Sequence, residues 1–230
     1  MRTETKPGIR RVVRQARRAM PAEVRRDAAE AFEAGFFAIQ DGVRAVAGYL
    51  PLATEPDIEP LLRRARNAGT PVYLPVAAPE RTLCWALDSG RYSASAIGGG
   101  PEPIGERLST EDMVRRVDVI LVPALAVDRA GHRLGQGGGY YDRAFAALIT
   151  GQVTGQPRPS LNQSGPGLSL SQSRPSLSQP AKSGVRRPEF WAVVYDDEVL
   201  ENGALPAEQH DLIVDAALTP SGLLRCTVPA

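Results

Sequence analysis

The chain has 230 residues, 43% of them hydrophobic, and its 27 basic side chains nearly balance its 26 acidic ones. This length is enough for one sizeable core, and the small net charge gives no indication of binding to nucleic acid or to an anionic membrane. The basic N-terminus lacks the apolar stretch of a secretory signal, and no run approaches the roughly 20 apolar residues of a membrane span. Two cysteines, Cys84 and Cys226, are too few for a disulfide framework. We therefore expect a cytoplasmic globular protein.

Two helices are expected at the start of the chain. In residues 6–20, apolar side chains recur at helical spacing and arginines occupy the remaining faces. Pro21 suits a first helical turn, and the Ala-rich run from there to about Gln40 predicts the second helix.

Strands and helices alternate in the middle of the chain. Residues 43–52 are predicted to form a buried strand that ends in a proline-bearing loop, 58–67 a helix and 72–76 another strand. This order is a βαβ unit, which implies a parallel sheet with helices on its faces. A further strand is expected over residues 82–87, a loop over 98–105, and the most apolar strand, central in the sheet, over 117–127.

The last third of the chain contains a segment of different composition. Residues 151–188 are rich in Ser, Pro, Gly and Gln, without acidic or aromatic residues, and cannot bury enough apolar surface to offset their ordering entropy. We expect a disordered surface insertion within a single domain of residues 1–230, and favour a tolerated linker over a basic segment that binds an anionic partner. Around it, a helix is expected over residues 140–149 and strands over 190–195 and 216–218.

Residues 133–142, RLGQGGGYYD, carry the strongest functional signal. Glycines let a backbone approach a phosphate closely and turn its N–H groups toward the anion, and the following helix adds its positive end. Arg133 supplies a fork of donors for phosphate oxygens, and Asp142 follows at a position suited to a phosphate-bound Mg²⁺. The segment lacks both the Gly-Lys-Ser/Thr of a Walker motif and the dinucleotide-binding fingerprint. It therefore predicts a phosphate-binding loop of a less common kind.

As a whole, the segment resembles the 5-formyltetrahydrofolate cyclo-ligase (5,10-methenyltetrahydrofolate synthetase) family, whose pattern is D-x-x-G-x-R-L-G-x-G-x-G-Y-Y-D. Here that pattern begins at Asp128 and ends at Asp142. Three other elements of the family are matched in order: K-x-x-x-R by Lys6 and Arg10, Y-x-P-x-x-x-E by residues 49–55, and P-x-E-x-H-D by residues 206–211. The resemblance covers nearly the whole chain except residues 151–188.

The resemblance implies an α/β fold of three layers, with a mainly parallel sheet flanked by helices, similar to the NagB/RpiA/CoA-transferase-like fold. It also implies an ATP- and Mg²⁺-dependent ligase that converts 5-formyltetrahydrofolate to 5,10-methenyltetrahydrofolate and releases ADP and phosphate. The expected partner is a reduced folate, with or without a polyglutamate tail. No nucleic-acid or membrane partner is expected, and a monomer is favoured.

Site residues follow from the same resemblance. ATP binding is expected at Lys6, Arg10, Arg133, Leu134, Gly135, Gln136, Gly137, Gly138, Gly139, Tyr140 and Tyr141. Folate binding is expected at Leu50, Glu55, Gln136, Gly137, Gly138, Gly139 and Tyr140, catalysis at Arg133, Tyr140 and Asp142, and Mg²⁺ binding at Asp142 and Asp211. Core packing is the alternative for one of the two tyrosines. Val127, Gln136 and Glu198 depart from the family's usual residues, which bears on the fit of the substrate.

Two other functions remain open at this point. The first is another phosphate-binding enzyme of a related α/β fold, such as a sugar-phosphate isomerase or a CoA transferase, which would not hydrolyse ATP. The second is a non-enzymatic binder, either a catalytically weak folate-binding paralogue or an RNA-associated protein that uses the arginine-rich N-terminus. Phosphate release that depends on both ATP and 5-formyltetrahydrofolate separates the ligase from both.

Overall fold

The computed structural model describes residues 5–39, 41–95, 100–146, 187–208 and 211–227. The predicted insertion therefore lies outside the described residues except for its last two positions, and so do the last three residues of the helix expected over 140–149. Its disorder and the single-domain organisation stay predictions. No helix in the described ranges is long and apolar enough to cross a membrane.

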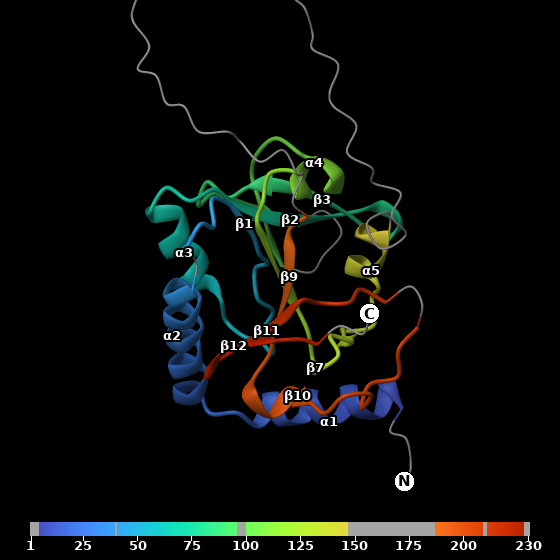
Figure 1. Cartoon of the computed structure of the whole chain (residues 1–230). Coiled ribbons are helices and arrows are strands. Elements are labelled where there is room, and N and C mark those ends of the chain that lie inside the picture. Colours follow the sequence, from blue (N-terminus) through green and yellow to red (C-terminus); the bar gives the residue numbers. More distant parts are fainter. Residues whose placement is uncertain (1–4, 40, 96–99, 147–186, 209–210, 228–230) are drawn as a thin grey trace, which may run out of the picture.

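A seven-stranded sheet forms the centre of the structure, with the strand order β12-β11-β9-β6-β1-β2-β3 (Figure 1). Five adjacent strands run parallel: β11 (Ala216–Thr219), β9 (Glu189–Val193), β6 (Val119–Pro123), β1 (Val46–Ala47) and β2 (Val72–Ala78). The two edge strands, β12 (Gly222–Arg225) and β3 (Thr82–Leu87), are antiparallel to their neighbours. The predicted mainly parallel sheet and its βαβ unit are thus confirmed.

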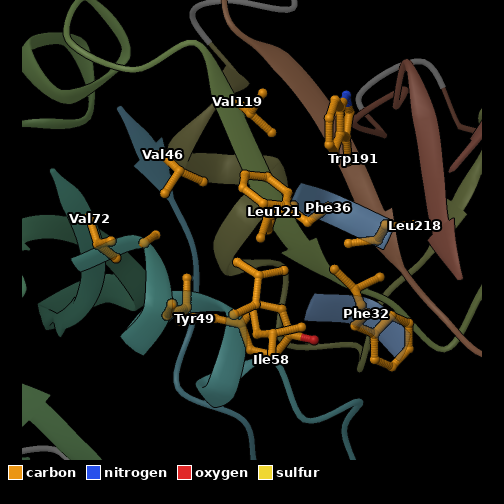
Figure 2. Packing of buried hydrophobic residues seen from close by; sticks show 14 of the residues in the cluster. Phe32, Phe36, Val46, Tyr49, Ile58, Val72, Val119, Leu121, Trp191 and Leu218 are labelled. Carbon is orange, nitrogen blue, oxygen red and sulfur yellow. The ribbon is translucent and has the colours of Figure 1, made fainter. Parts of the chain in front are cut away.

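Helices cover both faces of this sheet. On one face, α2 (Ala22–Ile39) and α3 (Glu59–Asn67) lie side by side and direct apolar residues onto the strands (Figure 1). Figure 2 shows Phe32 and Phe36 among the strand residues of this core, and the Phe36 ring lies 5.9 Å from that of Trp191. On the other face, α4 (Thr110–Val114) and α5 (Tyr140–Ala144) contribute to a second core. The three-layer α/β architecture is therefore confirmed.

The first helix, α1 (Lys6–Ala19), packs on a smaller sheet rather than on the large one. Thr5 caps it by accepting a hydrogen bond from the backbone of Gly8. The smaller sheet has the order β10-β7-β8, from β10 (Val199–Leu200), β7 (Ala126–Asp128) and β8 (Arg133–Leu134). Ile9 of α1 is buried against Ala126 and Leu134 of this sheet. Figure 1 shows α1 running past β7 and β10. The chain reaches β10 shortly after it leaves β9.

The long central strand expected over residues 117–127 is wrong in one respect, because it is divided between the two sheets. β6 ends at Pro123 and β7 begins at Ala126. Between them, Ala124 O accepts a hydrogen bond from Arg17, and Leu125 N donates to Leu134 O instead of to the large sheet. All these residues are buried or nearly so, so apolar character alone could not show the break.

Two further expectations are corrected. Of residues 43–52, only Val46 and Ala47 form a strand, β1, although Gly48 N still donates to Tyr73 O of β2. Gly48 passes so close to α3 that an added Cβ would lie 2.6 Å from Leu62. The predicted loop over 98–105 contains β5 (Pro101–Pro103), which pairs with β4 (Tyr92–Ala94) in a two-stranded sheet. Two short 3₁₀ helices, η1 (Pro79–Arg81) and η2 (Asp196–Glu198), complete the described elements. Proline at both outer positions of β5 obscures its strand character in the sequence.

Candidate active site

A cavity of about 720 Å³ lies where β1, β2 and β6 end, which is where open parallel sheets usually bind ligands. All residues predicted for the site line it: Lys6, Arg10, Leu50, Glu55, Asp142, Asp211 and residues 133–141. These residues come from α1, the loop after β1, the segment from β8 into α5, and the loop before β11. The structure therefore brings together groups that are more than 200 positions apart in the chain.

The glycine loop, residues 135–139, runs from β8 into α5. Gly137 has a φ of 98° and Gly139 a φ of 68°, values that L side chains rarely adopt, so glycine is needed at both positions. The described part of α5 is only five residues long, so the predicted contribution of its positive end is modest here. The loop backbone itself is what faces the cavity.

Arg133 and Asp142 form an ion pair at one side of this loop. Arg133 Nη2 donates to Asp142 Oδ1 at 2.7 Å, and its side chain is only 4% exposed. Arg133 Nη1 donates to Pro123 O, while Nε is buried and has no hydrogen-bond partner among the described residues. Both hydrogen bonds that Asp142 accepts reach Oδ1, the second coming from Leu212 N. Its Oδ2 atom has no hydrogen-bond partner among the described residues.

Lys6 and Arg10 lie on the inner face of α1, one turn apart. Lys6 Nζ donates to Asp211 Oδ2 at 2.8 Å and to Glu208 Oε1 at 2.9 Å. Partial burial lowers the pKa of Lys6, but the hydrogen bonds to Asp211 and Glu208 outweigh it, so this pKa lies above its ordinary value. Arg10 Nε donates to Gly135 O at 2.9 Å, which leaves the other N–H groups of its guanidinium without a described partner.

Glu55 lies on another wall of the cavity and is only 9% exposed. Its Oε2 accepts a hydrogen bond from Leu52 N at 3.0 Å, and its Oε1 lies 3.4 Å from Gln136 Nε2. Gln136 in turn accepts hydrogen bonds from Arg14, a residue of α1. A carboxylate held in this way can accept from adjacent N–H groups of a heterocycle.

The two tyrosines differ in their surroundings. Tyr141 packs against Trp85 and Phe145 in the second core, and its hydroxyl is buried without a partner among the described residues. Burial and the negative charge of Glu55 raise the pKa of Tyr141 far above its ordinary value, so the phenol is neutral. Tyr140 is half-buried, and the Arg143 guanidinium lies 5.9 Å from its ring centre. Core packing thus applies to the ring of Tyr141, whose hydroxyl still faces polar groups of the site.

Asp142 and Asp211 suit a phosphate-bound Mg²⁺ chemically. In the described part of the chain, no three His, Cys, Asp or Glu side chains are grouped so that they could hold a metal by themselves. Mg²⁺ in nucleotide sites, however, is commonly held by one or two carboxylates together with phosphate oxygens and water. Both aspartates line the same cavity as the glycine loop, and Asp142 Oδ2 accepts no hydrogen bond from the described residues. The donor set therefore fits a metal that arrives with its nucleotide.

Several residues of the site were not predicted from the sequence. Arg14 contacts the glycine loop, Glu208 pairs with Lys6, and Glu102 lines the cavity while its Oε1 accepts a hydrogen bond from Ser95. Arg14 follows Arg10 by four positions, and this spacing was a usable signal that both share a helix face. Glu208 lies within the matched segment of residues 206–211. For Glu102, no local pattern in the sequence indicates its place.

The chain is similar in sequence to known proteins. The family model of the 5-formyltetrahydrofolate cyclo-ligase family matches residues 2–160. A protein of Mycolicibacterium smegmatis named 5-formyltetrahydrofolate cyclo-ligase is 33% identical over 96% of this chain and 96% of its own length. One of the same name from Escherichia coli K12 is 30% identical over 58% of this chain and 76% of its own.

Solved structures agree in fold. A 5,10-methenyltetrahydrofolate synthetase of Aquifex aeolicus superimposes with a TM-score of 0.66 at 24% identity, covering 98% of this chain and 94% of that one. One of Mycoplasma pneumoniae superimposes with a TM-score of 0.60 at 14% identity, covering 94% and 98%. At these identities the structures bear on the fold alone, whereas the sequence matches extend over most of the chain. The chain belongs to the 5-formyltetrahydrofolate cyclo-ligase family.

Proposed function

We propose that this chain catalyses the ATP- and Mg²⁺-dependent cyclisation of 5-formyltetrahydrofolate to 5,10-methenyltetrahydrofolate, with release of ADP and phosphate. The observation that carries the proposal is that one cavity combines a glycine loop and its cations with the buried carboxylate of Glu55. Membership of the family supports the same reaction. A sugar-phosphate isomerase or an RNA-binding protein has no need for a phosphate-binding loop and a buried carboxylate in the same cavity.

The reaction requires activation of the formyl oxygen, because an amide-like oxygen is a poor leaving group. The formyl oxygen bonds to the γ-phosphorus of ATP as the bond from that phosphorus to ADP breaks. N10 of the folate then bonds to the formyl carbon and loses its proton. The bond from that carbon to the phosphorylated oxygen breaks, and phosphate leaves with the former formyl oxygen. No covalent bond to the protein is needed, so positioning and charge neutralisation dominate catalysis.

The cationic side of the cavity is assigned to ATP. Arg133 lines the cavity and presents its guanidinium to the transferred phosphoryl group. Lys6 and Arg10 neutralise the remaining phosphates, and the backbone of residues 134–139, with Tyr140 and Tyr141, encloses them. Bound Mg²⁺ would neutralise phosphate oxygens, and Asp142 and Asp211 are the residues that would hold it.

The part of the cavity around Glu55 and Leu50 is assigned to the reduced folate. Glu55 accepts from the N–H groups of the pterin ring, and Leu50 contacts the apolar part of the same ring system. Residues 136–140 lie between the two ligands and contact both. Tyr140 stacks on a ring of the folate and so helps to orient the formyl group toward the γ-phosphate.

The decisive experiment follows the near-ultraviolet absorbance of the methenyl product with purified protein, Mg-ATP and 5-formyltetrahydrofolate. We expect the absorbance to rise and phosphate to be released in equal amount, and neither to occur when ATP, Mg²⁺ or the folate is left out. A flat trace from well-folded protein would refute the proposal. Phosphate release from ATP without the folate would point to a different phosphate-transfer enzyme, and salt-sensitive RNA binding without turnover to a non-enzymatic binder.

A further inference from the structure

Four basic residues of α1 face the interior along one stripe: Lys6, Arg10, Arg14 and Arg17. Their spacing of four, four and three positions places them on one side of a helix. The middle two hold consecutive carbonyl groups of the glycine loop. Arg10 Nε donates to Gly135 O at 2.9 Å, and Arg14 Nη2 donates to Gln136 O at 2.6 Å. The loop is therefore anchored to α1 at two successive points.

Arg14 also determines which way the amide of Gln136 points. Its Nε and Nη2 atoms both donate to Gln136 Oε1, at 3.1 and 3.0 Å. A guanidinium has only donors, whereas an amide side chain has an acceptor end and a donor end. The oxygen of Gln136 must therefore face Arg14, and its NH₂ group must face the other way, where it lies 3.4 Å from Glu55 Oε1.

Glu55 depends on such donors because it is buried. It forms no ion pair among the described residues, and its two oxygens face Gln136 Nε2 and Leu52 N. A buried carboxylate needs its few hydrogen bonds to keep one orientation, since each lost donor exposes the cost of its desolvation. Arg14 reaches Glu55 only through Gln136, and it is not among the described residues that line the cavity.

We propose that Arg14 is a positioning residue for folate binding, which acts by orienting Gln136 so that this residue holds the carboxylate of Glu55. The inference rests on the proposed function, in which Glu55 and the glycine loop bind the folate. It assigns the two residues that anchor the glycine loop, Arg10 and Arg14, to different ligands. Arg10 secures the loop for ATP, and Arg14 secures the wall against which the folate binds.

The test is a comparison of kinetic constants in Arg14→Met, an uncharged variant of similar length. We expect the KM for 5-formyltetrahydrofolate to rise about tenfold, the scale of a lost hydrogen bond to a charged group. The KM for ATP and kcat should each change less than about threefold, because Arg10 still holds Gly135. Arg14→Lys should give an intermediate KM for the folate, since one ammonium can hold the Gln136 carbonyl but not replace the fork.

Two further variants separate orientation of Glu55 from simple anchoring of the loop. Gln136→Glu keeps an oxygen on Arg14 but turns a second oxygen toward Glu55, so it should raise the KM for the folate by a larger factor than the KM for ATP. In a cycle of Arg14→Met, Gln136→Ala and the double variant, the double variant should be no worse than Gln136→Ala alone. The matched control is Arg18→Met, one turn beyond Arg14, at an exposed residue that makes no hydrogen bond to the described residues.

The outcomes discriminate clearly. Equal increases in both KM values, additive effects in the cycle, or the same change in Arg18→Met would overturn the role of Arg14. If Arg14→Met does not fold, as judged by its thermal midpoint, the Gln136→Glu result decides. Titration of 5-formyltetrahydrofolate without ATP keeps the two proposals distinct. An inactive wild type that binds the folate and loses about tenfold affinity on Arg14→Met refutes the proposed turnover but supports the positioning role.

Discussion

The guanidinium of Arg133 donates to the carboxylate of Asp142 at 2.7 Å, and both side chains line the cavity that contains the glycine loop. This ion pair connects Arg133, the residue expected to bind phosphate, with Asp142, a residue expected to hold Mg²⁺. Arg133 Nη1 also donates to Pro123 O, so two hydrogen bonds already hold the guanidinium in position for an anion. Such preorganised donors lose little free energy to reorganisation during the reaction.

Arg133→Ala should therefore lower kcat/KM strongly. We expect a loss of about 2–4 kcal/mol in transition-state stabilisation, the size measured for other preorganised donors. Arg133→Lys keeps the charge but not the fork, so it should recover only part of the activity. The measurement is steady-state turnover with ATP saturating, accompanied by a thermal midpoint, because Asp142 loses its partner. Near wild-type turnover in Arg133→Ala would sink the assignment.

Lys6→Met should weaken ATP binding and lower the free energy of unfolding by an amount that does not depend on pH near neutrality. Because the pKa of Lys6 in the folded protein lies above 10.5, its ion pairs stabilise the fold fully below that pH and are lost only as pH rises through the folded value. The free energies of unfolding of Lys6→Met and wild type should therefore differ by a constant amount from about pH 7 to 9. Urea titrations at several pH values test this, and a difference that shrinks within that range contradicts it.

Arg17 and Glu198 form a buried pair, with two hydrogen bonds of 2.7 and 2.6 Å and an Arg17 side chain only 1% exposed. Burial raises the pKa of Glu198 although Arg17 opposes the shift. Without Arg17, the buried carboxylate would lose the positive charge that compensates for its desolvation. Arg17→Met should cost about 3–5 kcal/mol in the free energy of unfolding. Arg17→Met with Glu198→Gln should recover most of that loss in urea unfolding. If the double variant is as unstable as Arg17→Met, the lost hydrogen bond from Arg17 to Ala124 O, and not the unpaired Glu198, accounts for most of the loss in stability.

Tyr141→Phe should have opposite effects on stability and turnover. The Tyr141 hydroxyl is buried without a described partner, and a group of this kind costs about 1–3 kcal/mol. Its removal should leave the thermal midpoint unchanged or raise it, whereas kcat/KM should fall several-fold because a bound ligand loses a donor. Tyr140→Phe is the matched comparison, since the Tyr140 hydroxyl is not among the buried side-chain atoms that lack a partner in the described residues. A higher midpoint together with full activity would restrict Tyr141 to packing.

Much of the architecture could be predicted because it depends on short-range patterns. Residues 6–19 and 59–67 form helices, and residues 72–78 and 82–87 strands, close to where periodicity and composition placed them. The glycine loop was recognisable because its chemistry lies within ten consecutive residues. Strand ends were less predictable: the break after Pro123 depends on hydrogen bonds from Arg17 and Leu125 to distant partners.

The sequence by itself determined the family, the α/β class and the identity of many of the groups that line the site. These follow from residue types at fixed spacing. The alternating order of strands and helices implies a parallel sheet, in which the loops that contain these residues meet at one edge. Only the tertiary structure decided how those groups are connected. Three contacts arise between elements that are far apart in the chain: that of Arg14 with the glycine loop, that of Lys6 with Glu208, and that of Gln136 with Glu55. Their geometry depends on how α1 packs across the smaller sheet, which no local pattern records.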